Sequence, residues 1–149
     1  PHLFAGYEDH GRLIAPHPAG AWFKTGDLGR MTTPGLVVLG RRDEVIVSGG
    51  EKISPDEVEA VLRDHPAVAE AMVHGLTDPE WGQIVVASLV PRGTPPSDVD
   101  FARWLAARLA GFRRPRRWAW VDELPRTALG KPRRAALGQP IPRALPPIP

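Results

Sequence analysis

The sequence of 149 residues contains no cysteine, which excludes disulfides, thiolate catalysis and cysteine-based metal sites. It has no apolar run as long as a membrane span, and its first residues lack the basic and then apolar pattern of a signal peptide. No pair among its five histidines has the spacing typical of metal ligands, so we expect no metal site on this chain. These absences predict a soluble, cytoplasmic protein. The hydrophobic fraction of 42% is high enough for a buried core.

Lysine is also scarce. Of the 19 basic residues only Lys24, Lys52 and Lys131 are lysine. Lysine carries a compact ammonium on a flexible stem, whereas arginine presents a planar fork. A site that needs one movable point charge against a developing anion therefore favours lysine. Lys131 ends a turn at residues 124–131 that contains proline and glycine, where a solvated surface lysine is the competing interpretation.

The charges are distributed unevenly along the chain. Residues 1–102 contain 8 Lys or Arg and 15 Asp or Glu, a net charge of −7. Residues 103–149 contain 11 and 2, a net charge of +9. Such asymmetry is typical of a surface that faces a polyanion, which here means nucleic acid, a membrane surface or a polyphosphate cofactor. A solvated basic tail is the alternative.

Hydrophobic periodicity and turn residues divide the chain into short elements. The clearest is a helix, because Ser54 and Glu57 form a capping box around a proline and the apolar residues that follow repeat at helical spacing to about Asp64. A second helix is predicted at about residues 98–110. Strands are predicted near residues 13–14 and at residues 35–40, 43–48, 67–76, 84–90 and 117–122.

The order of strand pair, helix, strand pair, helix and strand predicts a small α+β domain with helices packed on a mixed or antiparallel sheet. The strands at 67–76 and 84–90 are joined by a tight turn and are expected to be antiparallel. Residues 138–149 contain five prolines and are predicted to form an extended, poorly ordered tail.

Three short segments suggest a nucleotide site. Asp27 follows a glycine turn, where a carboxylate can accept hydrogen bonds from both hydroxyls of a ribose or from nearby backbone donors. Arg41 and Asp43 put charge at a joint between two strands, although a surface turn would look the same. Gly49 and Gly50 let a backbone approach a ligand closely, or simply form a tight turn.

A fourth segment, residues 111–118, contains four arginines with flanking aromatic residues. This composition suits phosphate binding and stacking on a base. Single-stranded RNA binding fits it as well, and the spacing within the segment does not decide between them.

Taken together and in order, these segments resemble the C-terminal part of the adenylate-forming superfamily, which includes acyl- and aryl-CoA synthetases. The resemblance covers about residues 3–137. Its motifs are Thr25-Gly26-Asp27, Gly40-Arg41-Arg42-Asp43, Ser48-Gly49-Gly50-Glu51, Pro55-x-Glu57-Val58-Glu59, Asp78-x-x-Trp81-Gly82, Phe112-Arg113-Arg114-Pro115 and Leu124-Pro125-Arg126-Thr127-x-x-Gly130-Lys131.

The resemblance implies a division of the chain. Residues 1–41 would be the last β segment of a large N-terminal domain, residues 42–137 a small mobile C-terminal domain, and residues 138–149 a Pro-rich tail. The glycine-rich ATP phosphate loop and the acyl pocket of such enzymes are not found in this sequence. We therefore expect a fragment that is inactive without the missing N-terminal domain, with Mg²⁺ ligands also on that domain.

The resemblance also implies roles for particular residues. In the family reaction a carboxylate attacks the α-phosphate of ATP to give an acyl-adenylate, and the thiol of CoA then displaces AMP. Lys131 matches the catalytic lysine of the first step. Asp27 and Arg41 match residues that bind the ribose of ATP or AMP, and Asp43 matches the hinge about which the small domain rotates. The residues matching CoA contacts are Gly49, Gly50, Trp81, Phe112, Arg114 and Arg116.

The resemblance implies a small carboxylate as the substrate, with ATP and CoA as the other partners. The stretch from Ser48 to Glu57 is most similar to aryl- and medium-chain acyl-CoA ligases, and the o-succinylbenzoate–CoA ligases of menaquinone synthesis have a similar stretch. An adenylation domain of a peptide synthetase fits less well, because Arg114 and Arg116 suit soluble CoA. A non-catalytic module that binds CoA or nucleic acid is the alternative from another class, and the Thr25–Asp27 motif disfavours it.

Overall fold

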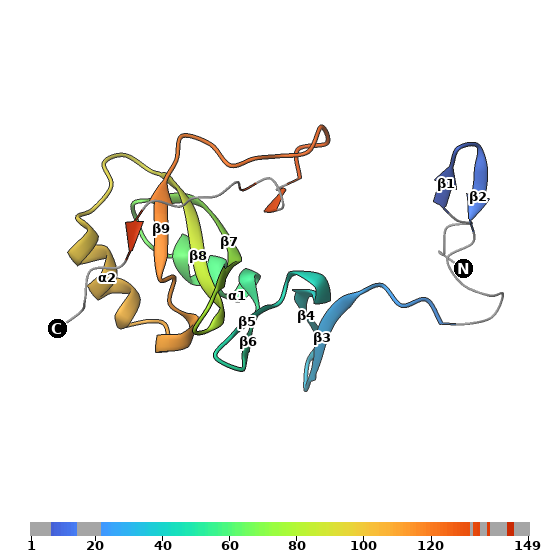
Figure 1. Cartoon of the computed structure of the whole chain (residues 1–149), viewed down its shortest axis with the longest axis horizontal. Coiled ribbons are helices and arrows are strands. Elements are labelled where there is room, and N and C mark those ends of the chain that lie inside the picture. The colour runs from blue at the N-terminus through green and yellow to red at the C-terminus, as the bar shows by residue number, and fades with distance from the viewer. Residues whose placement is uncertain (1–6, 15–21, 132, 135–136, 138–142, 145–149) are drawn as a thin grey trace.

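The computed structural model describes residues 7–14, 22–131, 133–134, 137 and 143–144. Its largest sheet is mixed and has six strands (Figure 1). The strands are β5 (Ile46–Ser48), β6 (Glu51–Ile53), β7 (Val68–Asp78), β8 (Gly82–Pro91), β9 (Arg117–Trp120) and β10 (Arg143–Ala144). β8 pairs antiparallel with β7 over the length of both strands and with β5 at one position, and it pairs parallel with β9. The predicted antiparallel pair at residues 67–76 and 84–90 is confirmed.

β8 lies inside the sheet because it is apolar on both faces. Val85, Ala87 and Leu89 point into the main core, whereas Ile84 and Val86 form a second cluster on the other side. This alternation is the period of two expected for a strand, with both faces buried.

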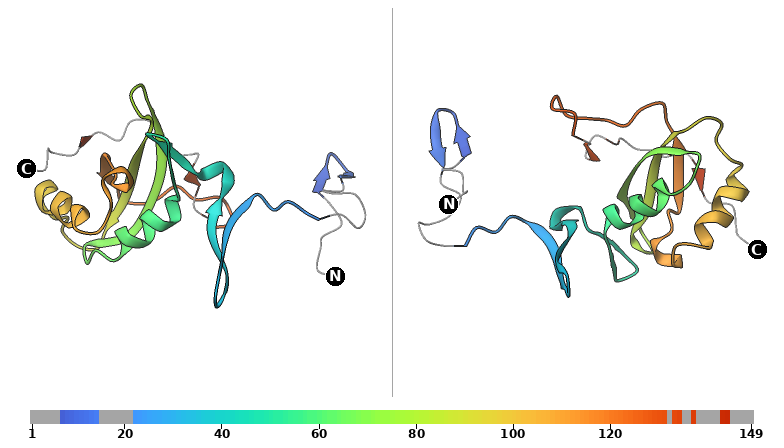
Figure 2. Two further views of the ribbon diagram at one scale, coloured as in Figure 1. Left: turned by 90° about the horizontal axis from the view of Figure 1, so that it is seen from below. Right: turned by 180° about the vertical axis from the view of Figure 1, so that it is seen from behind.

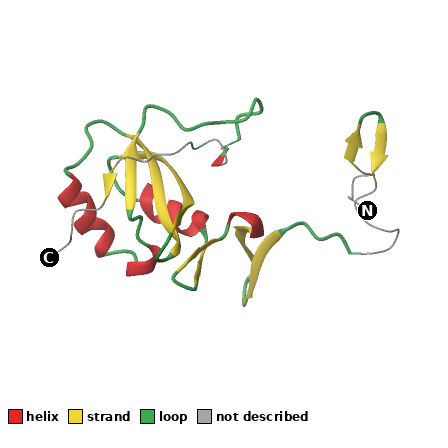
Figure 3. Cartoon of the chain, in the orientation of Figure 1, coloured by secondary structure: helices red, strands yellow, loops and turns green. Residues whose placement is uncertain are grey.

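Two helices complete the main core (Figure 3). α1 (Pro55–Arg63) and α2 (Asp98–Ala106) contribute to the same apolar cluster as the sheet. Their buried residues in this cluster are Val58 and Leu62 from α1 and Phe101, Ala102 and Leu105 from α2. The predicted α+β fold with helices packed on a small sheet is thus confirmed, and the parallel β8–β9 pair makes the sheet mixed.

Two hairpins precede the sheet (Figure 2). β1 (Tyr7–Asp9) pairs with β2 (Arg12–Ile14), which confirms the strand predicted near residues 13–14. β3 (Asp27–Thr32) pairs with β4 (Gly35–Arg41). The β3–β4 hairpin exposes several large apolar side chains, namely Met31, Leu36, Val37 and Val38.

The segment after β4 differs from the prediction of a strand at 43–48. Arg42–Glu44 form a short 3-10 helix, η1, and β5 begins only at Ile46. The Arg41 side chain donates to Asp43 two residues on, at 3.3 Å, and the N–H of Arg42 donates to Gly26 O at 2.8 Å. These local bonds turn the chain instead of extending it.

The helix ends also differ in detail. Ser54 is the N-cap of α1 and Pro55 its first residue, as predicted, but Ser54 makes no side-chain capping bond and Glu57 pairs with Arg113 at 3.4 Å. The capping bond predicted from the Ser54 side chain is therefore not made. α2 ends at Ala106 instead of about residue 110, because Arg108 and Leu109 both donate to Leu105 O in a tightened last turn.

Within the segment predicted to be an extended, poorly ordered tail, Arg143–Ala144 form β10 and pair antiparallel with Arg117 and Trp118 of β9. The other residues of this predicted tail lie outside the described part of the chain. No helix within the described residues is both long and apolar enough to cross a membrane.

His65 is buried between the two helices. Its ring makes edge-on contacts with Phe101 and Trp104, at centroid distances of 5.2 and 4.8 Å. Its Nδ1 lies 3.1 Å from the N–H of Ala67 and accepts its hydrogen bond. Burial, and secondarily the charge of Arg108, lowers the pKa of His65 below its ordinary value. The fold therefore disfavours the protonated form of this histidine.

We expect the stability of the chain to fall as the pH falls below about 6.5, the ordinary pKa of histidine. The unfolded chain takes up a proton there, whereas folded His65 does so only at lower pH, so acid favours unfolding. The measurement is the unfolding free energy of the parent and of His65→Asn between pH 8 and 5.5. Asparagine keeps an acceptor for Ala67 without the titration, so the decline should be smaller in the variant. Equal declines would contradict the prediction, and the comparison cancels the effects of other groups, including His74, whose pKa burial also lowers.

Candidate functional site

Lys131 lies at the end of a tight turn. The N–H of Thr127 donates to Lys131 O and that of Gly130 donates to Thr127 O, both at 2.8 Å. The N–H of Lys131 donates to Thr127 Oγ1 at 3.2 Å, and Gly130 has a φ of +78°, which favours glycine. Lys131 is exposed, and no carboxylate pairs with its ammonium among the ion pairs of the described residues. The turn thus presents a free point charge.

The turn is attached to the sheet on its N-terminal side. Arg126 pairs with Glu70 of β7 and also donates to Gly130 O at 3.1 Å. The N–H of Arg133 donates to Pro125 O at 2.8 Å and closes the base of the turn. These bonds hold the backbone on both sides of Lys131.

Lys131 lines a pocket of about 410 Å³ together with Arg41. Acidic residues of α1 and β7 form part of the same wall, namely Asp56, Glu59 and Glu70. Lys131, the predicted catalytic lysine, and Arg41, a predicted nucleotide-binding residue, therefore line the same pocket although they are 90 positions apart in the sequence.

Asp27, Arg41 and Asp43 are brought together at the junction of β3, β4 and η1. The Nη1 of Arg41 donates to Thr25 O at 2.7 Å and to Asp27 Oδ1 at 3.4 Å, while its Nε donates to Asp43 Oδ1 at 3.3 Å. The pKa of Arg41 is raised above its ordinary value, chiefly by the charge of Asp43. A single exposed arginine thus links the two carboxylates that the sequence motifs assigned to ribose and hinge.

A second group gathers at the turns beside β8. The N–H of Gly49 donates to Trp81 O at 3.0 Å, and the guanidinium of Arg116 lies 4.3 Å from the centre of the Trp81 indole. Gly49 has a φ of +57°, and a Cβ there would lie 2.9 Å from Trp81 Cε3. The backbone of Gly49 can approach the indole only because it has no side chain. Gly50 follows with a φ of +85° and open space around it.

Phe112 and Arg114 lie in or directly after the short helix η2 (Gly111–Arg113). Phe112 is exposed, and the guanidinium of Arg113 lies 5.6 Å from its ring centre. Within the described part of the chain, no ring contact or ion pair joins Phe112 or Arg114 to the Trp81 group. The structure therefore brings Gly49, Trp81 and Arg116 into contact, with Gly50 next to Gly49, and leaves Phe112 and Arg114 near Arg116 along the chain only.

No group of three His, Asp or Glu within the described residues could hold a metal ion.

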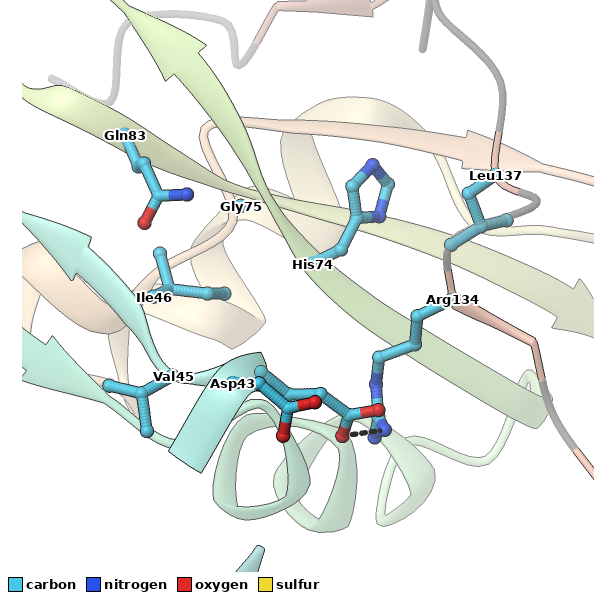
Figure 4. Close-up of a pocket in the computed structure, with 9 residues that line it drawn as sticks. Asp43, Val45, Ile46, His74, Gly75, Gln83, Arg134 and Leu137 are labelled. Carbon is cyan, nitrogen blue, oxygen red and sulfur yellow. Dashed lines mark hydrogen bonds and ion pairs between the residues drawn. The ribbon is translucent and has the colours of Figure 1, made fainter. Parts of the chain in front are cut away.

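Sequence analysis missed Arg134. Its guanidinium donates to Glu44 at 2.5 Å, to Asp56 at 2.5 Å and to Glu59 at 2.9 Å. Figure 4 shows it directed toward η1, beside a pocket of about 430 Å³ that His74 and Gln83 also line. The sequence signal was weak, because Arg133 and Arg134 are adjacent arginines and nothing in the spacing separates them.

Glu59 is the most buried of the three partners, with 9% of its side chain exposed. Burial raises the pKa of Glu59, whereas the hydrogen bond from Val73 N–H, at 2.8 Å, and the charge of Arg134 oppose that rise. Burial alone would lower the pKa of Arg134, but the charges and hydrogen bonds of its carboxylate partners outweigh this and raise it. The opposite charges of Glu59 and Arg134 thus offset the cost of burying each side chain.

Comparison with known proteins gives a consistent picture. The family described as AMP-binding enzyme C-terminal domain matches residues 57–131. A 2-succinylbenzoate–CoA ligase of Geobacillus kaustophilus is 41% identical over 145 residues, which are 96% of this chain and 30% of the relative. An indoleacetate–CoA ligase of Aromatoleum aromaticum is 43% identical over 124 residues, or 82% of this chain and 24% of the relative.

Among solved structures, o-succinylbenzoate CoA synthetase from Bacillus subtilis in complex with an acyl-adenylate intermediate matches with a TM-score of 0.76 and 42% identity. The match covers 88% of this chain and 26% of that protein. The chain thus spans between 24% and 30% of the length of these three relatives.

Proposed function

The chain belongs to the AMP-binding enzyme C-terminal domain family, and from this premise we propose that it is the C-terminal part of an ATP-dependent acyl- or aryl-CoA ligase. The observation that carries the proposal is the pocket that both Arg41 and Lys131 line, where no carboxylate of the described residues pairs with the ammonium of Lys131. A mobile positive charge beside a guanidinium is the arrangement that a phosphate ester under attack requires.

In this proposal residues 1–41 end a large N-terminal domain, residues 42–137 are a small mobile domain, and residues 138–149 are its tail. The β3–β4 hairpin supports the first assignment, because Met31, Leu36 and Val38 are exposed there. Large apolar side chains gathered on one hairpin usually have a covering surface. The acyl pocket, the ATP phosphate loop and the magnesium ligands would belong to that N-terminal domain.

The first half-reaction joins a carboxylate to ATP. A carboxylate oxygen attacks the α-phosphorus, and the bond to pyrophosphate breaks. Lys131 would lie between the carboxylate and the α-phosphate and stabilise the negative charge that develops there. Asp27 would accept hydrogen bonds from the ribose hydroxyls, and Arg41, already between Asp27 and Asp43, would hold the nucleotide against it.

The second half-reaction forms the thioester, as the CoA thiol attacks the acyl carbon and AMP leaves. We assign Gly49, Gly50, Trp81 and Arg116 to CoA, with Phe112 and Arg114 at its nucleotide end. Support comes from the close approach of Gly49 to Trp81 and the stacking of Arg116 on that indole. Rotation about Asp43, which is exposed in η1 between β4 and β5, would exchange Lys131 for this group.

The alternative of nucleic-acid binding has less support. Several arginines of the basic C-terminal part are paired with carboxylates of this chain, namely Arg103, Arg113, Arg126 and Arg134. Four of the 11 basic residues that suggested a polyanion surface are therefore paired within the chain. The remaining cations near Trp81 suit a compact phosphate ligand such as CoA better than a long strand.

We propose an aromatic carboxylate as the substrate, with o-succinylbenzoate as the leading compound and menaquinone synthesis as the setting. The names of the relatives support the choice of substrate, since one is a 2-succinylbenzoate–CoA ligase, one an o-succinylbenzoate CoA synthetase and one an indoleacetate–CoA ligase.

The test uses the complete protein encoded by the gene, incubated with ATP, CoA and either o-succinylbenzoate or indoleacetate. We expect AMP and a CoA thioester in equal amounts, identified by mass spectrometry, with o-succinylbenzoate the faster substrate. Turnover of indoleacetate alone would overturn the substrate and keep the ligase. Release of no AMP with a panel of aryl and medium-chain carboxylates would contradict the ligase itself.

A further inference from the structure

Arg134 lies three residues beyond Lys131 and ties that segment to the rest of the domain. Its three carboxylate partners come from two separate elements, since Glu44 belongs to η1 and Asp56 and Glu59 belong to α1. Only 19% of the Arg134 side chain is exposed. One side chain of the C-terminal segment therefore bridges the start of the domain and its first helix.

The chemistry of the contact requires arginine. Its planar fork offers donors in several directions at once, and here Nη1 serves Glu44 while Nη2 serves Asp56 and Glu59. A buried carboxylate such as Glu59 needs a charged and hydrogen-bonded partner. Arg63 also lies near Glu59, at 3.6 Å, but it is on the same helix and connects nothing to the Lys131 segment.

We propose that Arg134 is a positioning residue that fixes Lys131 in its pocket and couples it to the hinge. Arg126 holds the turn from the N-terminal side through Glu70, and Arg134 holds it from the C-terminal side. Without Arg134, the bond from Arg133 N–H to Pro125 O still closes the base of the turn, but no side chain after Lys131 ties the turn to η1 and α1. Because Glu44 adjoins Asp43, the same clamp makes the lysine turn and the hinge segment move as one body. The inference rests on the proposed role of Lys131 in adenylation.

The test is a double-mutant cycle in the complete protein with Lys131→Ala, Arg134→Gln and the double variant. Acyl-adenylate formation and thioester formation from supplied acyl-adenylate are measured separately. We expect Arg134→Gln to lower kcat for adenylation about tenfold, with KM for ATP and the thioester step changed less than threefold. In the Lys131→Ala background the same change should have less than a twofold effect, because the lysine it positions is gone.

The inference would be overturned if the double variant lost adenylation rate by the product of the two single losses, since Arg134 would then act independently of Lys131. If Lys131→Ala alone left the adenylation rate unchanged, the proposed role of the lysine would fail, and this inference would fail with it. That outcome is distinguishable from independent effects of the two substitutions. A matched control removes the same charge nearby without releasing the turn, namely Arg133→Gln, because the Arg133 side chain is exposed and its contact with Pro125 is made by the backbone N–H. This variant should leave adenylation within twofold of the parent.

If Arg134→Gln fails to fold, two milder variants keep the test. Arg134→Lys retains the charge but not the fork, and we expect it to recover part of the adenylation rate. Glu44→Gln removes only the link to η1 and should slow adenylation about threefold in the parent and not in the Lys131→Ala background. Glu44→Gln with equal effects in both backgrounds would contradict the coupling.

Discussion

Replacing Lys131 with alanine in the complete protein is expected to slow acyl-adenylate formation about 100- to 1000-fold, the loss typical of one donor that stabilises developing negative charge. We expect a loss of this size because a hydrogen-bonded turn holds the backbone of Lys131 and no carboxylate of the described residues neutralises its ammonium. Thioester formation from supplied acyl-adenylate should change less than threefold. Rapid-quench measurement of the two half-reactions separates the outcomes.

Two further variants sharpen the result. Lys131→Arg keeps a positive charge but spreads it over a planar fork, so we expect it to recover little of the adenylation rate. Lys52→Ala removes another exposed lysine, on β6, and should leave adenylation unchanged. Equal losses in both half-reactions for Lys131→Ala would contradict its assignment to the first step alone.

Replacing Gly49 with alanine is expected to have the opposite effect on the two half-reactions. At a φ of +57° an alanine carries strain on the order of 2 kcal/mol, which corresponds to a rate loss of about 30-fold if the strain falls on the step that uses the turn. Its Cβ would also lie 2.9 Å from Trp81 Cε3 and displace the indole on which Arg116 stacks. We expect slower thioester formation and a higher KM for CoA, with adenylation within threefold of the parent.

Gly93→Ala is the matched control for backbone strain. Gly93 follows β8 with a φ of +85°, and a Cβ at this position would have no neighbouring atom within 4 Å, so the strain is similar and the contact is absent. A comparable loss of thioester formation in Gly93→Ala would mean that the effect at Gly49 reflects general destabilisation. Unchanged CoA kinetics in Gly49→Ala would remove this turn from the CoA site.

The elements with strong periodicity were predictable from the sequence. α1 combines a proline start with apolar residues at helical spacing, and β7 and β8 are long apolar runs on either side of a tight turn. The resemblance to the adenylate-forming superfamily is also confirmed, because it depended on several motifs in order instead of one pattern.

The missed strands have a common physical reason. β3 and β6 are short or exposed and contain mostly polar residues and glycine, so neither shows a buried face in the sequence. They exist because β4 and β5 pair with them. β10 is missed for a related reason, since its two residues form a strand only against β9.

The residues of the candidate site could be predicted from the sequence, but their arrangement in space could be predicted only in part. The sequence indicated Asp27, Arg41 and Lys131, but the pocket shared by Arg41 and Lys131 arises from tertiary folding. Arg134 was out of reach because its importance depends on three carboxylates at residues 44–59, brought together by η1 and α1. The catalytic and binding roles of all these residues stay predictions.

The parallel pairing of β8 with β9 has a consequence for the order of assembly. β7 and β8 form a local hairpin, and such hairpins form within microseconds. α1 directly precedes this hairpin in the chain. β9 can join only after the chain has crossed over through α2, a long-range closure that is slower. The turn that ends in Lys131 follows β9 in the chain. We therefore expect this turn, which carries the proposed catalytic lysine, to fold after the β7–β8 hairpin and α1.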